Sequence, residues 1–245
     1  MPNRHRLFQV LLRNTQRGFM AQWIILHIIN MHKKQLSTIL FDFNNALSKD
    51  HFYTTLKKSH PDAHKKLTQI LFGPKACTLT SQWMRGEISY KDIHREISSK
   101  VGLHAYTLDK ALVASVKKMT INMPMLCFSQ KMRAQGVKIA IFTDNMDVFD
   151  EIYVPYTGLD KKFDRIFSSN SQKKLKLDNN GKFIFEAIST MQSHPKNTLL
   201  IDDFISNGDA LKKAGGTFYH YNRYTEGHRD FIKWFSDNFT SFDTK

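Results

Sequence analysis

Residues 37–45 read Ser-Thr-Ile-Leu-Phe-Asp-Phe-Asn-Asn, and this apolar run that ends in an acid decides the fold. The β-forming residues Thr38 to Phe41 are typical of a short, buried parallel strand, and Asp42 follows where that strand ends. In an open α/β sheet, the carboxyl ends of the strands border the crevice in which ligands bind. Asp42 is therefore expected to present a rigid carboxylate to a site, although many core strands also end in an Asp that only forms a turn.

Three later segments end in the polar groups that such a carboxylate would need. They are 137–142 followed by Thr143, 163–169 followed by Lys173, Lys174 and Lys176, and 198–201 followed by Asp202, Asp203 and, four residues on, Asn207. Because the carboxyl ends of parallel strands meet at one edge of a sheet, these side chains are expected to converge on Asp42. Carboxylate oxygens suit a hard cation such as Mg²⁺, and a lysine and a hydroxyl remain to hold phosphate.

Four motifs therefore occur in a fixed order. They are Asp42-Phe-Asn-Asn-Ala-Leu, Thr143, Lys176 and Asp202-Asp203. Over about residues 37–222 this set resembles the haloacid dehalogenase (HAD) superfamily of Mg²⁺-dependent phosphotransferases. The stretch 83–103 is similar to the helical cap that phosphatase-like members insert after the first motif, and 201–215 is similar to their last motif. The resemblance implies a hydrolase of the phosphatase-like kind.

The resemblance also implies a role for each residue of the set. Asp42 is the expected nucleophile, which attacks phosphorus to give an aspartyl-phosphate that water then cleaves. The expected catalytic residues are Asp42, Asn44, Thr143 and Lys176; the expected phosphate-binding residues are Thr143, Asp144 and Lys176; and the expected Mg²⁺ ligands are Asp42, the carbonyl of Asn44 and Asp203, with Asp202 behind them. Asn207 is expected to position the loop that carries Asp203.

Two of these assignments leave alternatives open. Thr143 can bind a phosphoryl oxygen, cap the amino end of a following helix, or do both. Lys176 fits the family pattern, but Leu177 stands where the family usually has proline, so Lys174 and Lys173 remain alternatives for the site lysine.

Asn44 is the main departure from the family pattern. Phosphatases of this superfamily carry a second Asp at this position, two residues after the nucleophile, to protonate the leaving group and then activate water. An amide cannot carry a proton at neutral pH, and general acid–base catalysis contributes about 10²–10⁴-fold. Asn44 therefore favours either a slow phosphatase that selects good leaving groups, such as sugar 1-phosphates or acyl phosphates, or an impaired protein that binds a phosphorylated ligand or partner. It also reopens the dehalogenase and phosphonatase branches, while Asp202 and Asp203 favour a metal and so argue against dehalogenase.

Composition and charge set the class of protein and its partners. The chain has 245 residues, 41% of them hydrophobic, and two cysteines, which gives no disulfide framework and favours a reducing, cytoplasmic setting. Of the net charge of +14, residues 1–41 carry six bases and no acid, and residues 49–122 carry 13 bases against 6 acids. This distribution favours a small anionic, phosphorylated substrate. Nucleic acid is not expected, because the lysines are scattered and no nucleic-acid motif accompanies them.

The expected architecture is α/β, a Rossmann-like parallel sheet flanked by helices with a helical cap insertion. Residues 1–36 form a basic and apolar extension, 37–48 and 121–245 the core, and 49–120 the cap. His60 and His64, on the cap, are interpreted as surface residues. The apolar run 19–29 is too short to span a bilayer, so the extension is a helix that docks on the domain or weakly on a membrane surface, an uncleaved targeting segment, or a dispensable extension. Oligomeric state does not follow from the sequence.

Overall fold

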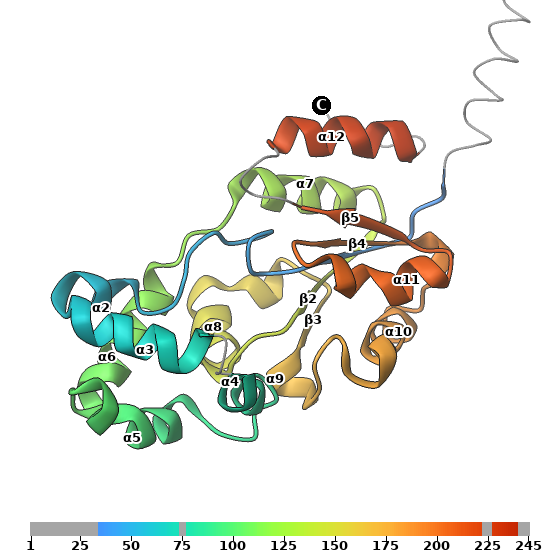
Figure 1. Cartoon of the computed structure of the whole chain (residues 1–245). Coiled ribbons are helices and arrows are strands. Elements are labelled where there is room, and N and C mark those ends of the chain that lie inside the picture. The colour runs from blue at the N-terminus through green and yellow to red at the C-terminus, as the bar shows by residue number, and fades with distance from the viewer. Residues whose placement is uncertain (1–33, 74–76, 222–226, 240–245) are drawn as a thin grey trace, which may run out of the picture.

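A five-stranded parallel sheet forms the centre of the protein. The computed structural model describes residues 34–73, 77–221 and 227–239. The strands follow the order β3-β2-β1-β4-β5 across the sheet (Figure 1). They are β1 (Thr38–Phe41), β2 (Lys138–Thr143), β3 (Arg165–Ser168), β4 (Thr198–Asp202) and β5 (Thr217–His220). The predicted α/β fold with a parallel sheet is confirmed, and β1 pairs with β2 on one side and β4 on the other.

Helices cover both faces of this sheet, because successive apolar residues of each strand point to opposite sides. Leu40 and its register partners Ala140 and Leu200 belong to the core under α10 (Lys182–Thr190) and α11 (Asp209–Lys213). Ile39 and its partners Ile139 and Leu199 belong to the core under α7 (Met123–Ala134) and α12 (His228–Asn238). Figure 1 shows these two helical layers on either side of the strands.

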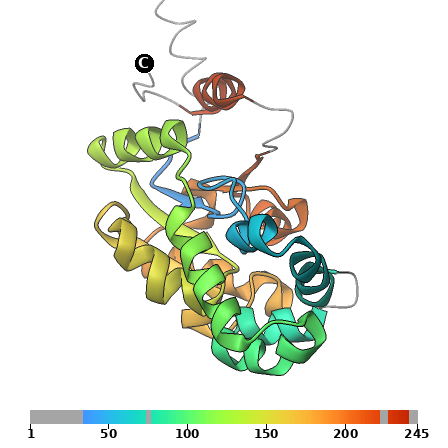
Figure 2. The same cartoon turned by 90° about the vertical axis from the view of Figure 1, so that its left-hand side faces the viewer.

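Five helices lie between β1 and α7. They are α2 (Thr54–Ser59), α3 (Pro61–Phe72), α4 (Cys77–Met84), α5 (Tyr90–Val101) and α6 (Ala105–Lys118). Figure 2 shows them grouped at one side of the sheet. They pack through apolar residues at helical spacing, such as Ile93 and Ile97 of α5 against Leu108 and Leu112 of α6. This group occupies the range expected for a cap; its standing as a separate domain stays a prediction.

A buried chain of polar groups lies inside this helical group. The hydroxyl of Tyr53 and Nε2 of His94 are 2.7 Å apart, and Nδ1 of His94 and Oδ1 of Asp109 are 2.6 Å apart. His94 is fully buried, and this burial lowers its pKa although Asp109 offsets part of the effect. The imidazole is therefore a neutral hydrogen-bonding link between α5, α6 and the segment before α2.

As the pH is lowered, we expect the free energy of unfolding to decrease more steeply in the wild type than in a His94→Gln variant. Below the ordinary pKa of 6.5, the unfolded chain binds a proton that the folded chain does not. The free energy of unfolding then decreases by at most about 1.4 kcal/mol for each unit by which the pH is lowered, until the lower pKa of the folded state is reached. Urea unfolding of both proteins at pH 7.5 and at pH 5 measures the difference in slope. Parallel pH curves for the two proteins would contradict a neutral buried His94.

The segment after β4 differs from the sequence-based expectation. The sequence also predicts a helix from Asp203 to Ala214, ended by Gly215 and Gly216, and the predicted start of this helix is wrong: a short 3-10 turn, Ile205–Gly208, comes first, and α11 begins at Asp209. The reason is a side-chain contact, because the carboxylate of Asp202 accepts the backbone N–H of Phe204 at 2.8 Å and holds the chain in a turn.

The amino-terminal extension lies almost wholly outside the described residues, since residues 1–33 are not among them. The predicted docking helix and the apolar run 19–29 fall in this range. Among the helices of residues 34–73, 77–221 and 227–239, none is both long and apolar enough to cross a membrane.

Candidate active site

The carboxyl edge of the sheet gathers three acids. Asp42 directly follows β1, and its backbone N–H donates to the carbonyl of Ile201 at 2.8 Å, which extends the pairing of β1 with β4. Asp202 is the last residue of β4, and Asp203 follows it. Carboxylate oxygens of Asp42, Asp202 and Asp203 all lie within 4.8 Å of one another. Because the backbone at Asp42 is fixed by the neighbouring strand, its carboxylate has a defined position.

Lys176 joins two of these acids. It lies in the segment between β3 and α10, and it is 3% exposed. Its ammonium donates to Oδ1 of Asp42 at 2.7 Å and to Oδ2 of Asp202 at 2.7 Å. Its backbone N–H donates to Oδ1 of Asp144 at 2.9 Å, which anchors the lysine-bearing segment to the loop after β2. A side chain from a separate strand loop thus completes the cluster.

The two alternative lysines lie elsewhere. Lys173 donates to the carbonyl of Gly86, and Lys174 forms an ion pair with Glu186 of α10. Neither contacts the three acids. Of the three lysines that the sequence left open, Lys176 is therefore the one that the structure places beside Asp42.

Burial and charge govern the protonation of the cluster. Burial raises the pKa of Asp42 to about 8; Lys176 lowers it in part, and Asp202 and Asp203 raise it further. Burial by itself lowers the pKa of Lys176, but Asp202, Asp42 and Asp144 together outweigh burial and raise it above its ordinary value. Lys176 is consequently a permanent cation, and one cation faces more negative charge than it can neutralise.

This excess of carboxylate fits a divalent cation. Asp42, Asp202 and Asp203 offer only oxygen ligands, which Mg²⁺ prefers, from three positions close together. The carbonyl of Asn44, also expected as a ligand, accepts the N–H of Ala46 at 2.8 Å. A carbonyl oxygen has a second lone pair, so that contact leaves room for one more partner.

The twin acids after β4 have different surroundings. Asp202 is fully buried, and its two oxygens accept from Nδ2 of Asn207 at 3.0 and 2.9 Å in addition to the contact with Lys176. Asp203 is partly exposed; its carboxylate accepts from the amide of Asn45, and its carbonyl lies 2.9 Å from Nε2 of His220. The sequence predicts that Asn207 positions the loop that carries Asp203. In the structure, the side chain of Asn207 holds the carboxylate of Asp202 instead.

Asn45 was missed as a site residue by sequence reasoning. Its φ is +64°, a left-handed conformation that Asn adopts more readily than most residues. This bend places its side chain against Asp203. The signal was the second Asn after the strand, which is typical of such a turn.

Thr143 has a buried hydroxyl that makes no hydrogen bond to any part of the described chain. The hydroxyl therefore does not cap a helix, which was the alternative left open. A buried hydroxyl without a partner costs about 1–3 kcal/mol. At the end of β2, next to Asp144 and its contact with Lys176, it is a donor that a bound phosphoryl group could use.

A second group of contacts fixes one end of the helical cap to the core. The carboxylate of Asp147 accepts from Nε1 of Trp83 at 2.7 Å and from the backbone N–H of Tyr90 at 2.9 Å. Ser169 donates to the carbonyl of Met84 at 2.7 Å, and Arg85 forms an ion pair with Asp178 at 2.6 Å. Sequence reasoning missed Asp147, because its partners are distant in the chain.

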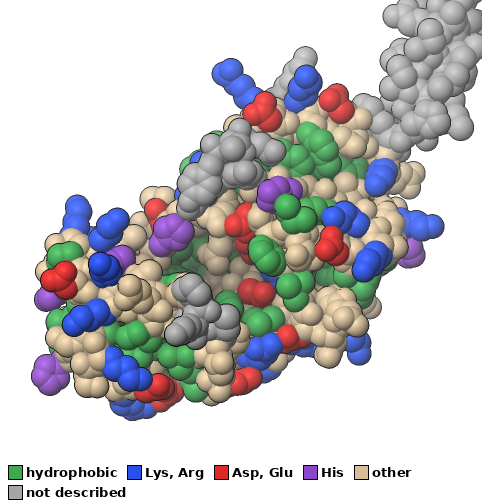
Figure 3. Space-filling model, viewed as in Figure 1, with side chains coloured by type: hydrophobic (Ala, Val, Ile, Leu, Met, Phe, Trp, Pro, Cys, Tyr) green, Lys and Arg blue, Asp and Glu red, His purple; other side chains and the backbone are tan. Residues whose placement is uncertain are grey.

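A pocket of about 540 Å³ lies between the cap helices and the core. Figure 3 shows the surface hollowed between the cap on the left and the core on the right, with acidic and histidine side chains at its border. The pocket is lined by Asn44, Asn45, Asp50, His51, Phe52, His64, Thr68, Phe72, Thr80, Met84, Asp144 and Met146. His64 lines this pocket and is partly exposed, and His60 is exposed.

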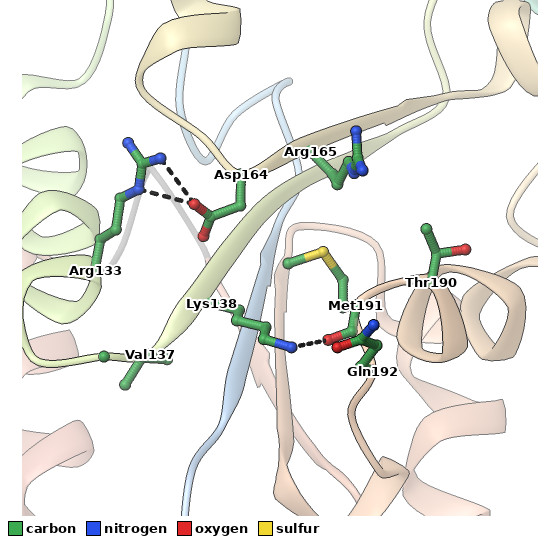
Figure 4. A pocket seen from close by; sticks show the side chains of 9 residues that line it. Arg133, Val137, Lys138, Asp164, Arg165, Thr190, Met191 and Gln192 are labelled. Atoms are coloured by element: carbon green, nitrogen blue, oxygen red, sulfur yellow. Dashed lines mark hydrogen bonds and ion pairs between the residues drawn. The ribbon is translucent and has the colours of Figure 1, made fainter.

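A larger cavity, about 680 Å³, lies at the opposite edge of the sheet, where β2 and β3 begin (Figure 4). Two of its three cations are engaged in structural contacts: Arg133 pairs with Asp164 at 2.8 Å, and Lys138 donates to the carbonyl of Met191 at 2.7 Å. Asp164 also accepts the backbone N–H of Ile139 at 2.8 Å. The three acids and Lys176 lie at the other ends of the strands, so this cavity is separate from the cluster around Asp42.

Solved structures share this fold. A predicted HAD-like family hydrolase from Porphyromonas gingivalis matches with a TM-score of 0.62 at 17% identity, over 82% of this chain and 98% of that one. A HAD family enzyme from Bacteroides thetaiotaomicron, in complex with magnesium and inorganic phosphate, matches with a TM-score of 0.60 at 16% identity, over 80% and 99%.

The L-2-haloacid dehalogenase from Xanthobacter autotrophicus, with chloropropionic acid covalently bound, matches with a TM-score of 0.54 at 14% identity, over 75% of this chain and 76% of that one. No protein-family model matches the sequence, and no curated protein does. The structural matches span phosphate-binding and dehalogenase members, so they identify the fold without selecting a reaction.

Proposed function

We propose that this chain, which has the fold of the HAD-like hydrolases, is a Mg²⁺-dependent phosphatase that acts on a small phosphate monoester. The observation that carries the proposal is the contact of one buried ammonium, Lys176, with Asp42 and Asp202 at 2.7 Å each. This arrangement supplies a fixed carboxylate and a permanent cation at one point. Asp203 adds further oxygen ligands there.

In the proposed reaction Asp42 is the nucleophile. Oδ1 accepts from Lys176, and Oδ2, which has no hydrogen-bond partner in the described part of the chain, attacks phosphorus. The bond from phosphorus to the leaving-group oxygen breaks, and an aspartyl-phosphate forms. Water then attacks phosphorus, which releases phosphate and restores the carboxylate.

Other residues of the cluster hold the transferring group. Lys176 and the hydroxyl of Thr143 donate to phosphoryl oxygens, where charge builds up in the transition state. Asp42, Asp202 and Asp203 would hold Mg²⁺, which offsets the repulsion between carboxylates and phosphate when it is bound. Asn207 keeps Asp202 in place.

The proposal is tested by two product assays on the same preparation. Inorganic phosphate is measured from 4-nitrophenyl phosphate, and chloride from 2-chloropropionate, each with Mg²⁺ and with a chelator. We expect phosphate release that needs Mg²⁺ and no chloride release. Chloride release that is unchanged by the chelator would instead place the chain with the dehalogenases. The pair Asp202 and Asp203 argues against that outcome.

We expect an Asn44→Asp variant to gain activity selectively. An acid at this position can protonate a poor leaving group, so turnover of an alkyl phosphate should rise by about 10²–10⁴-fold, while 4-nitrophenyl phosphate should change little. Asn44→Ala is the matched control, since it also removes the amide but adds no acid. An equal gain in alkyl phosphate turnover in Asn44→Asp and Asn44→Ala would exclude proton transfer as the cause.

Asn44 also supports a second candidate, a protein that binds a phosphorylated ligand without turning it over. Wild-type protein that releases no phosphate, beside an active Asn44→Asp variant, would select this candidate. The intact set of Asp42, Thr143, Lys176 and Asp203 favours the enzyme.

A further inference from the structure

We infer that the substrate is an aryl phosphate monoester with one phosphate and an otherwise uncharged aromatic leaving group. The inference rests on the proposed phosphatase function and adds the class of substrate. Two independent features carry it. One is the chemistry of the pocket between cap and core, and the other is the amide of Asn44.

A large part of the lining of the pocket is apolar. Phe52, Phe72, Met84 and Met146 line it. Phe72, at the end of α3, is 45% exposed, so its ring is accessible to a ligand in the pocket. Aromatic faces and methionine sulfurs both pack favourably on aromatic rings. A ring carried by the phosphate would therefore find matching surfaces.

Three of the polar residues that line the pocket are already engaged with other parts of the protein. The hydroxyl of Thr80 donates to the carbonyl of Leu71, and the amide of Asn45 donates to Asp203. Asp50 accepts the backbone N–H and the hydroxyl of Thr120 at 2.6 and 2.7 Å. A sugar would also bury hydroxyls against Phe52, Phe72, Met84 and Met146, and each hydroxyl without a partner there opposes binding. The pocket thus disfavours sugar phosphates, which Asn44 alone would allow.

The pocket also lacks a cation for a second negative group. No Lys or Arg lines it among the described residues, and its acids are Asp50 and Asp144. Burial, helped by Lys57, lowers the pKa of His64, so this imidazole is neutral at pH 7. The lysines of α2 and α3 are solvent-exposed, and none of them is among the residues that line the pocket. A diphosphate or a carboxylated ring would bring charge that nothing in the described lining offsets.

The leaving group must also depart without help from Asn44. Phenols are far more acidic than alcohols, so a phenolate leaves without prior protonation. Acyl phosphates share this property, but an acyl group that is small and polar leaves the apolar wall unused. A pocket of about 540 Å³ lies in the range of ordinary small-ligand sites, so it accommodates one aromatic group with its phosphate.

The first test is binding without turnover. Methylphosphonate, phenylphosphonate and 4-carboxyphenylphosphonate are titrated into the wild-type protein with Mg²⁺ by calorimetry. We expect phenylphosphonate to bind at least about tenfold more tightly than methylphosphonate, and the carboxylated ring to bind more weakly than the plain ring. Phe72→Ala should weaken phenylphosphonate by roughly 3- to 10-fold and leave methylphosphonate unchanged. Tyr106→Ala, which removes another exposed aromatic of the cap away from the pocket, is the control.

The second test compares turnover of phenyl phosphate, hexyl phosphate, acetyl phosphate and glucose 1-phosphate. The inference expects phenyl phosphate to have the highest kcat/KM, with the advantage reduced in Phe72→Ala. Equal binding of phenyl- and methylphosphonate, tighter binding of the carboxylated ring, or faster turnover of glucose 1-phosphate would overturn it. If no monoester releases phosphate but the phenylphosphonate preference and its loss in Phe72→Ala persist, the phosphatase function fails and the ligand class stands.

Discussion

The Asp42→Asn variant is expected to lose Mg²⁺-dependent phosphate release by about 10⁴-fold or more while it remains folded, the order of loss seen when the nucleophile of a catalytic unit is removed. An amide oxygen cannot form the aspartyl-phosphate, yet the side chain keeps its shape and can still accept a hydrogen bond from Lys176. Asp202 continues to pair with that lysine.

Stability separates this loss from unfolding. Burial raises the pKa of Asp42 to about 8, which means that its charge is costly in the folded state. The neutral Asn should therefore be no less stable than the wild type near pH 8. Turnover is measured as kcat, and folding by thermal unfolding of the same samples. Asp209→Asn makes the same change at an exposed acid of α11 and should alter neither quantity.

An outcome within about tenfold of wild-type kcat would remove Asp42 from the role of nucleophile. A mass increase by one phosphoryl group on acid-quenched wild type, absent from Asp42→Asn, would add direct support. The same adduct on the variant would point to another residue.

Replacing Lys176 by Met should produce the largest change in stability. The variant keeps much of the side-chain volume but leaves Asp42 and Asp202 buried without their shared cation. Breaking a buried ion pair from one side costs about 3–5 kcal/mol. We expect a loss of this size near pH 8 in the presence of a chelator, together with loss of phosphate release.

The loss should shrink in two conditions. Lys176 lowers the pKa of Asp42 in the wild type, so the variant raises this pKa further and its folded state takes up the proton at a higher pH; the difference in stability between the two proteins should therefore shrink as the pH is lowered. Bound Mg²⁺ should also restore it, because a ligand of the folded state stabilises that state by mass action.

Denaturant unfolding at pH 8 and pH 5.5, with chelator or Mg²⁺, measures both effects. Lys174→Met is the control, since its partner Glu186 lies at the surface and such pairs contribute about 0–1 kcal/mol. Equal losses in the two variants would show that the Lys176 contacts are energetically no different from a surface pair.

The sheet could be predicted because its signal is local. Each apolar run, such as 38–41 or 198–201, is buried on both faces, and that pattern requires no knowledge of its neighbours. Once the strands are parallel, their carboxyl ends share an edge, so Asp42 and Asp202 come together as a consequence of topology. Lys176 could be preferred only by resemblance, since nothing local distinguishes it from Lys174.

What could not be predicted depends on contacts between distant segments. Asp147 holds Trp83 across 64 residues of chain, and Asn45 reaches Asp203 across 158. The expected helix at Asp203 was wrong for the same reason, because a turn made by Asp202 replaces its first residues. The basic charge of the cap is not repeated in the pocket, since no Lys or Arg is among the described residues that line it.

The central position of β1 has a consequence for the lifetime of the site. Hydrogen bonds join this strand to β2 and to β4 along its whole length. Each of its amide protons can exchange with solvent only when the ladder to which it donates opens, and opening at a central strand belongs to the rarest fluctuations of a domain. Helices of the cap can fray, and loops can exchange product, while the backbone before Asp42 stays closed. Asp42 is thus attached to the part of the domain that opens least often.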